Sequence, residues 1–152
     1  MVDNDASECW PRARFPVLNR VPTRWGGNDH SGHVNNVVFS AWSDTTVNAT
    51  LIERCRCDIR KLSAVGFAVE TSCRYVAPLS SPAVVDVGLA VELLGSTSVV
   101  YRLAVFGEGE DTPAALGRFV HVYVDRHERR PVSVPDVIRR SMGSPEPVQI
   151  ES

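Results

Sequence analysis

The sequence contains no long hydrophobic run, and this absence argues against a membrane-spanning helix. Such a helix needs about 20 consecutive apolar residues, and no stretch of the 152-residue chain approaches that length. Residues 1–8 carry three acidic side chains and no apolar segment, unlike a secretory signal. These absences predict a cytoplasmic protein that has no membrane partner.

The chain also has no excess of positive charge. Its 16 lysine and arginine residues are balanced by 18 aspartate and glutamate residues, for a formal net charge of -2. Because affinity for a nucleic-acid backbone depends on a basic field, the composition argues against a nucleic-acid partner.

Cysteine is scarce and lacks the spacing of metal or redox sites. None of the four cysteines forms a CxxC pair, so reduced thiols are expected. His30 and His33 beside Asp29 are possible zinc ligands by residue type, but no fourth ligand accompanies them. We therefore expect no metal site.

A chain of this length holds one domain with one core. The polar, proline-containing ends predict a flexible leader over residues 1–12 and a flexible tail over residues 143–152. The expected domain covers residues 13–142.

The segment 35–54 has no glycine or proline, and its apolar residues cover most of a helix circumference. This pattern predicts a long helix buried in the middle of the domain. A single polar stripe interrupts it, because four polar residues recur at four-residue spacing: Asn36, Ser40, Asp44 and Asn48.

The remaining elements are predicted to be strands, apart from a short closing helix that begins near Pro135. One strand, residues 15–25, precedes the long helix, and its two prolines place it at a sheet edge or bulge. Four alternating segments follow, separated by turn residues. The expected fold is α+β in the order β-α-β-β-β-β, with a five-stranded antiparallel sheet on the helix.

In the last of these strands, the valines at 120, 122 and 124 are expected to pack on the helix. The alternate residues, Phe119, His121 and Tyr123, would then lie on the outer face of the sheet. Together with unpaired sheet edges, an outer face of this kind predicts self-association.

The turn before the long helix concentrates the residues with chemical potential. A carboxylate at Asp29 would lie beside a helix N-terminus, whose free N–H groups favour negative charge. The same N–H groups can stabilise an oxyanion, so the turn has the minimum equipment for acyl transfer to water. The alternative is structural: aspartate and asparagine are also the preferred residues for binding loop amides and capping helices.

Several segments resemble the 4-hydroxybenzoyl-CoA-thioesterase-like family. Arg24-Trp25 followed by residues 28–39, with Gly32-His33-Val34-Asn35-Asn36 at the centre, is similar to the family signature that leads into its central helix. Asp44-Thr45 and Asn48 resemble the D-T-x-x-N segment of one acyl-CoA thioesterase branch. Further resemblances lie at residues 75–79, 95–98 and 119–131.

This resemblance implies a hotdog fold and hydrolysis of an acyl-CoA thioester between two subunits, in a homodimer or a dimer of dimers, without metal or cofactor. It implies that Asp29 is the catalytic carboxylate, acting as nucleophile or general base, with backbone N–H groups near Asn36 as the oxyanion hole. His33 takes the histidine position of a related D-x-N-x-H turn in plant acyl-carrier-protein thioesterases, in which Ser31 replaces the asparagine. The residues implied in substrate binding are Gly32, Asn35, Asp44 and Ser98.

The motif departs from the family at one position, because Gly27 replaces its first acidic residue. This departure motivates a second hypothesis, a hotdog dimer that binds acyl-CoA without hydrolysing it. A hotdog hydratase is the third alternative. It is disfavoured because its D-x-N-P-x-H turn would need asparagine and proline where this chain has Ser31 and Gly32.

Overall fold

The computed structural model describes residues 10–22, 36–78, 84–143 and 148–151. The long helix α1 spans Asn36–Cys55, one residue away from each predicted end. The strands are β1 (Val17–Pro22), β2 (Ala64–Tyr75), β3 (Val84–Leu94), β4 (Ser98–Gly107), β5 (Ala115–Asp125) and β6 (Val148–Glu151). Two 3₁₀ turns, η2 (Arg12–Arg14) and η4 (Ile59–Lys61), and the short helix α2 (Asp136–Met142) complete the description.

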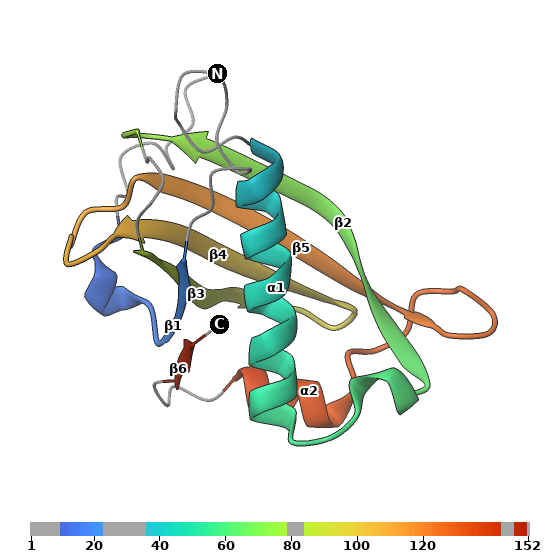
Figure 1. The fold of residues 1–152 in the computed structure, drawn as a ribbon. Helices are drawn as coiled ribbons and strands as arrows, with labels where there is room; N and C mark the ends of the chain where they lie inside the picture. The colour runs from blue at the N-terminus through green and yellow to red at the C-terminus, as the bar shows by residue number, and fades with distance from the viewer. Residues whose placement is uncertain (1–9, 23–35, 79–83, 144–147, 152) are drawn as a thin grey trace.

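The predicted α+β class is confirmed: β1 to β5 form an antiparallel sheet that curves around α1 (Figure 1). The strand order is β2-β5-β4-β3-β1-β6. A sixth strand, β6, pairs parallel to β1 and lies within the segment that sequence analysis assigned to a flexible tail. At the other end, Trp10 and Arg12 of the predicted leader contact the outer face of the sheet.

Helix α1 packs into the concave face of the sheet. Its buried side chains include Phe39, Trp42, Val47 and Leu51, and the buried amide of Asn19 in β1 donates a 3.0 Å hydrogen bond to Thr46 Oγ1. A helix packed in this way has a fixed position relative to the strands. No helix in the described part of the chain is long and apolar enough to cross a membrane.

The predicted facing of β5 is wrong. Phe119, His121 and Tyr123 are buried beneath α1, at 5%, 5% and 1% exposure, whereas the valines between them are half-buried. The register explains this result. Phe119 lies opposite Tyr101 and His121 lies opposite Val99. Since directly opposed residues share a face, the buried side chains of β4 turn these residues inward.

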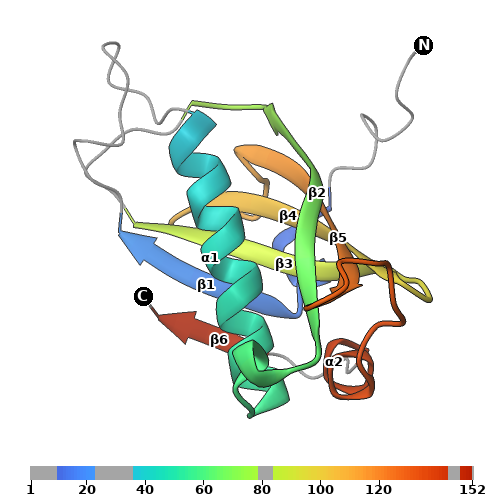
Figure 2. The same cartoon turned by 90° about the vertical axis from the view of Figure 1, so that its right-hand side faces the viewer.

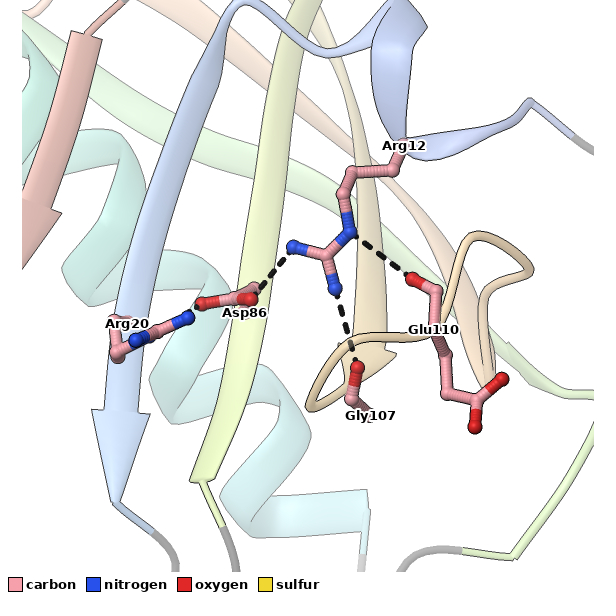
Figure 3. Close-up of polar contacts among 5 residues, drawn as sticks. All are labelled: Arg12, Arg20, Asp86, Gly107 and Glu110. Carbon is pink, nitrogen blue, oxygen red and sulfur yellow. Dashed lines mark hydrogen bonds and ion pairs between the residues drawn. The ribbon is translucent and has the colours of Figure 1, made fainter.

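The outer face of the sheet is closed by the segment that leads into β1. Phe15 packs there on Ala90, Ala104 and Phe106. Beside them, the carboxylate of Asp86 accepts hydrogen bonds from Arg12 at 2.6 Å and from Arg20 at 3.1 Å (Figure 3). Arg12 also donates to the carbonyls of Gly107 and Glu110. This cluster fastens the leader to three elements of the sheet.

Candidate functional site in the groove between α1 and β2

The predicted catalytic turn lies directly before α1. Asp29, Gly32, His33 and Asn35 fall outside the described residues. Asn36 is the first residue of α1, and only its backbone is described. The structure therefore establishes that α1 begins at Asn36, and the predicted catalytic residues come just before it in the sequence.

Along α1, the predicted polar stripe faces a groove that β2 borders. The two elements run side by side in opposite directions, as Figure 2 shows. The first half of α1 lies near the second half of β2, and the second half of α1 lies near the start of β2. Ser40 and Asp44 are exposed on the stripe, and Asn48 is half-buried with its amide donating to the carbonyl of Asp44 at 3.0 Å.

A cavity of about 230 Å³ lies at the end of the groove nearest the start of α1. Phe39, Ser40 and Ser43 line it from the helix, and Thr71 and Cys73 line it from β2. The Ser43 hydroxyl is buried and has no hydrogen-bond partner among the described residues. Cys73 is exposed as a residue, but partial desolvation of its thiol raises the pKa, which disfavours the nucleophilic thiolate form.

A second cavity, of about 150 Å³, lies farther along the groove, between the second half of α1 and the first residues of β2. We call it the His121–Tyr123 cavity, after the two β5 side chains in its wall. The Nδ1 of His121 and the hydroxyl of Tyr123 are buried and have no hydrogen-bond partner in the described structure. Burial lowers the pKa of His121, and the charge of Asp44 offsets part of that shift.

A larger cavity, of about 430 Å³, lies away from this groove, where Trp10 and Arg14 approach Arg54 and Met142. Its lining includes no residue of the α1 polar stripe and none of β2. We therefore place the candidate site in the groove despite the greater size of this cavity.

Ser98 lies at the opposite end of the molecule from the start of α1. It closes the β3–β4 turn, where its carbonyl accepts a hydrogen bond from Gly95 N–H at 2.8 Å. The same turn is held by Arg139 of α2, which donates to the carbonyl of Gly95, and α2 in turn packs at the end of α1 through Arg54 and Ser141. One chain therefore does not bring Ser98 next to Asn36; a site with both needs a second chain.

Sequence analysis did not predict the His121–Tyr123 cavity because it placed Phe119, His121 and Tyr123 on the outer face of the sheet. The signal that was available is size: Phe119, His121 and Tyr123 are larger than the valines between them and fill more space under a helix.

Among the described residues, no group of three or more histidine, cysteine, aspartate or glutamate side chains could hold a metal ion. The predicted alternative at His30 and His33 lies outside that part of the chain.

Comparison with known proteins relates this geometry to one family. The profile of the thioesterase-like superfamily matches residues 23–142, which include the predicted catalytic turn, α1 and strands β2 to β5. A comparison with curated proteins finds no match.

Solved structures match along almost the whole chain. The PA5185 protein from Pseudomonas aeruginosa strain PAO1 is 41% identical with a TM-score of 0.85, and the match covers 93% of this chain and 99% of that chain. A thioesterase from Thermus thermophilus, solved in complex with coenzyme A and Zn, is 29% identical with a TM-score of 0.73, covering 87% and 95%. The PA2801 protein from Pseudomonas aeruginosa, a proposed thioesterase, is 28% identical with a TM-score of 0.74, covering 85% and 99%.

Proposed function

The chain belongs to the thioesterase-like superfamily, and from this premise we propose that it hydrolyses an acyl-CoA thioester to the free acid and CoA. The observation that carries the proposal is the extent of the family match. It covers residues 23–142, and so includes both the segment with Asp29 and the elements that border the groove. The similar thioesterase from Thermus thermophilus was solved with coenzyme A, which supports a CoA-linked substrate.

In the proposed mechanism, Asp29 either attacks the thioester carbonyl or removes a proton from the water that attacks it. Helix α1 begins at Asn36, a few residues after Asp29. Its free N–H groups supply the oxyanion hole, and its dipole favours the ionised form of a carboxylate at that position. His33 lies in the same turn of the sequence and is a secondary candidate for contact with the reacting atoms.

We extend the proposal to a homodimer, alone or as a dimer of dimers, in which two copies of β2 pair along their free edges. β2 is the last strand of the sheet at one end, and all its residues from Phe67 to Tyr75 are exposed. Phe67 and Val69 are 41% and 59% exposed there. A long exposed edge with apolar side chains is a template for strand pairing. The β2 edge, rather than the buried side chains of β5, is thus the basis for self-association.

The direct test is release of free thiol from a panel of acyl-CoA esters by the parent protein and by the Asp29→Asn variant. The substitution keeps size and hydrogen bonding but removes basicity, so we expect kcat to fall by roughly 10²- to 10⁴-fold. Binding of a non-hydrolysable acyl-CoA should change little, because the loss falls on the transition state. Asp136→Asn, at the start of the short helix α2, is the matched control and should retain full activity.

The second candidate function, acyl-CoA binding without hydrolysis, is favoured by Gly27 in place of the family's first acidic residue. Tight acyl-CoA binding by the parent protein without thiol release would support it. Hydrolysis that survives Asp29→Asn at the parent rate would contradict our assignment of the carboxylate and direct attention to Asp44 and His33.

A further inference from the structure

The cavity away from the groove lies where the segment before β1 meets the end of β3 and the end of α2. We call it the Arg14–Arg54 cavity, after the two cationic side chains in its wall. Its volume of about 430 Å³ falls in the range of small-molecule sites, which extends from about 300 to 1,000 Å³. Because none of the described residues in its wall belongs to β2 or to the polar stripe of α1, it is a site distinct from the groove.

The cavity exists because β3 extends beyond its partner strand. β1 begins at Val17, opposite Leu89, whereas β3 continues to Leu94. The chain before β1 turns away from the sheet through η2, and no described strand pairs with the last residues of β3 on that side. The resulting space is lined by Ala90, Val91 and Leu94.

Most of the remaining wall is aliphatic. Val17 and Leu89 come from the paired part of β1 and β3, and Met142 comes from α2. All three are buried members of the main core, and Val91 and Leu94 pack against that core. Since core packing holds these side chains in place, the wall is a preformed apolar surface. It suits an aliphatic chain.

Arg14 adds positive charge to this wall. Its side chain is exposed, and its guanidinium carbon lies 3.9 Å from the centre of the Trp10 ring. Trp10 is itself held from another side, because Arg102 lies 4.4 Å from the same ring centre. Arg14 makes no ion pair within the described structure. Its charge is therefore available to a ligand.

Arg54, near the end of α1, is the second cation in the wall. It is half-buried, and one of its terminal nitrogens donates to the carbonyl of Ser141 at 3.4 Å. None of the described residues in the wall is acidic. Two guanidinium groups without an acidic neighbour complement an anion, and the planar guanidinium matches the geometry of a carboxylate or a phosphate.

We propose that the Arg14–Arg54 cavity binds a small anionic amphiphile, a molecule with an aliphatic chain and a carboxylate or phosphate head group. The chain lies along the end of β3, between Leu89 and Leu94, and the head group pairs with Arg14. The free acid that the proposed reaction releases is one member of this ligand class. Binding itself does not depend on that reaction, so failure of the proposed hydrolysis would leave this inference open to its own test.

The test is titration calorimetry with three ligands that share an eight-carbon chain: octanoate, octyl phosphate and 1-octanol. An apolar cavity of about 150 Å³ accepts benzene, so a cavity of about 430 Å³ has room for this chain. We expect at least one of the two anions to bind about fivefold more tightly than the alcohol, and the tighter anion identifies the head group. Hexanoate should bind about tenfold more weakly than octanoate if the chain is buried.

Arg14→Gln separates the head group from the chain. It should weaken binding of the preferred anion about fivefold and leave 1-octanol unchanged, because only the anion pairs with the guanidinium. Arg60→Gln is the matched control: Arg60 is also exposed, but it lines the His121–Tyr123 cavity of the groove. This variant should bind all three ligands as the parent protein does.

Leu94→Trp tests the position of the chain, since the larger side chain occupies the cavity. It should weaken binding of the anions and the alcohol alike. Urea denaturation establishes whether this half-buried position tolerates tryptophan; if the variant does not fold, the exposed Arg14 still decides the question.

Three results would overturn the inference. Equal affinity for the anions and the alcohol would remove the role of the arginines. An effect of Arg60→Gln on the anion without an effect of Arg14→Gln would place the ligand in the groove. Failure of all three ligands to bind at about 1 mM would indicate that the chain itself fills the cavity.

Discussion

Two sets of buried polar side chains, one on each face of the sheet, differ in their hydrogen bonding. On the outer face, Asp86 is 3% exposed and accepts hydrogen bonds from two arginines, as Figure 3 shows. On the concave face, His121 Nδ1 and the Tyr123 hydroxyl are buried without partners in the described structure. A buried group with its partners in place contributes to stability, whereas one without partners costs stability. The contrast separates a cluster whose buried polar groups are paired from two buried polar atoms that have no partner in the described structure.

The outer cluster provides the largest expected effect of a substitution on stability. Asp86→Ala removes the carboxylate that Arg12 and Arg20 share, and Arg12 is itself mostly buried, with 20% side-chain exposure. Breaking a buried ion pair from one side leaves a charge without compensation. We expect the free energy of unfolding to fall by about 3 kcal/mol, measured by urea denaturation.

Arg20→Ala is the control within the same cluster. The Arg20 side chain is 52% exposed, so its ion pair is screened by solvent and should contribute less than about 1 kcal/mol. A loss in Arg20→Ala as large as the loss in Asp86→Ala would contradict the view that burial of Arg12 and Asp86 determines the strength of the cluster.

Acid should lower the free energy of unfolding, because His121 is buried on the concave face of the sheet. Burial lowers the pKa of this imidazole from the ordinary value of 6.5, although Asp44 offsets part of the shift. Below the ordinary pKa the unfolded chain binds a proton that the folded chain resists, so the stability present above about pH 6.5 is lost as pH falls through the folded pKa. Between about pH 7 and pH 5, we expect the free energy of unfolding, measured by urea denaturation, to fall more steeply in the parent protein than in His121→Phe. Parallel curves would contradict this.

The comparison of the two faces also shows what sequence could predict. The bounds of α1 follow from a segment without glycine or proline and from its apolar coverage, both of which are local properties. The facing of β5 depends on its register with β4, in which Phe119 lies opposite Tyr101. Both alternating sets of β5 are largely apolar, so periodicity alone cannot choose between them.

The parts that sequence reasoning missed depend on long-range contacts. Trp10 and Arg12 were assigned to a flexible leader because their contacts, among them Asp86 and Gly107, lie far away in sequence. The strand β6 is four residues long and is defined by its pairing with β1. The roles of Asp29, Asn36 and His33 remain predictions of the motif, and the structure adds the residue at which α1 begins and the groove that lies beside this helix.

The smallest expected effect concerns Tyr101, and it tests whether buried polar atoms of the concave face lack partners. The Tyr101 hydroxyl is fully buried with no hydrogen-bond partner among the described residues, and burial raises the pKa of its phenol. Removing a buried group that makes no hydrogen bond relieves its desolvation cost, whereas removing one that is paired loses about 1 kcal/mol. We therefore expect Tyr101→Phe to change the free energy of unfolding by less than about 0.5 kcal/mol, or to raise it slightly. Urea denaturation beside the parent protein measures the difference. A loss of about 1 kcal/mol or more would mean that the hydroxyl is paired in solution, and the contrast between the two faces would then be confined to His121 and Tyr123.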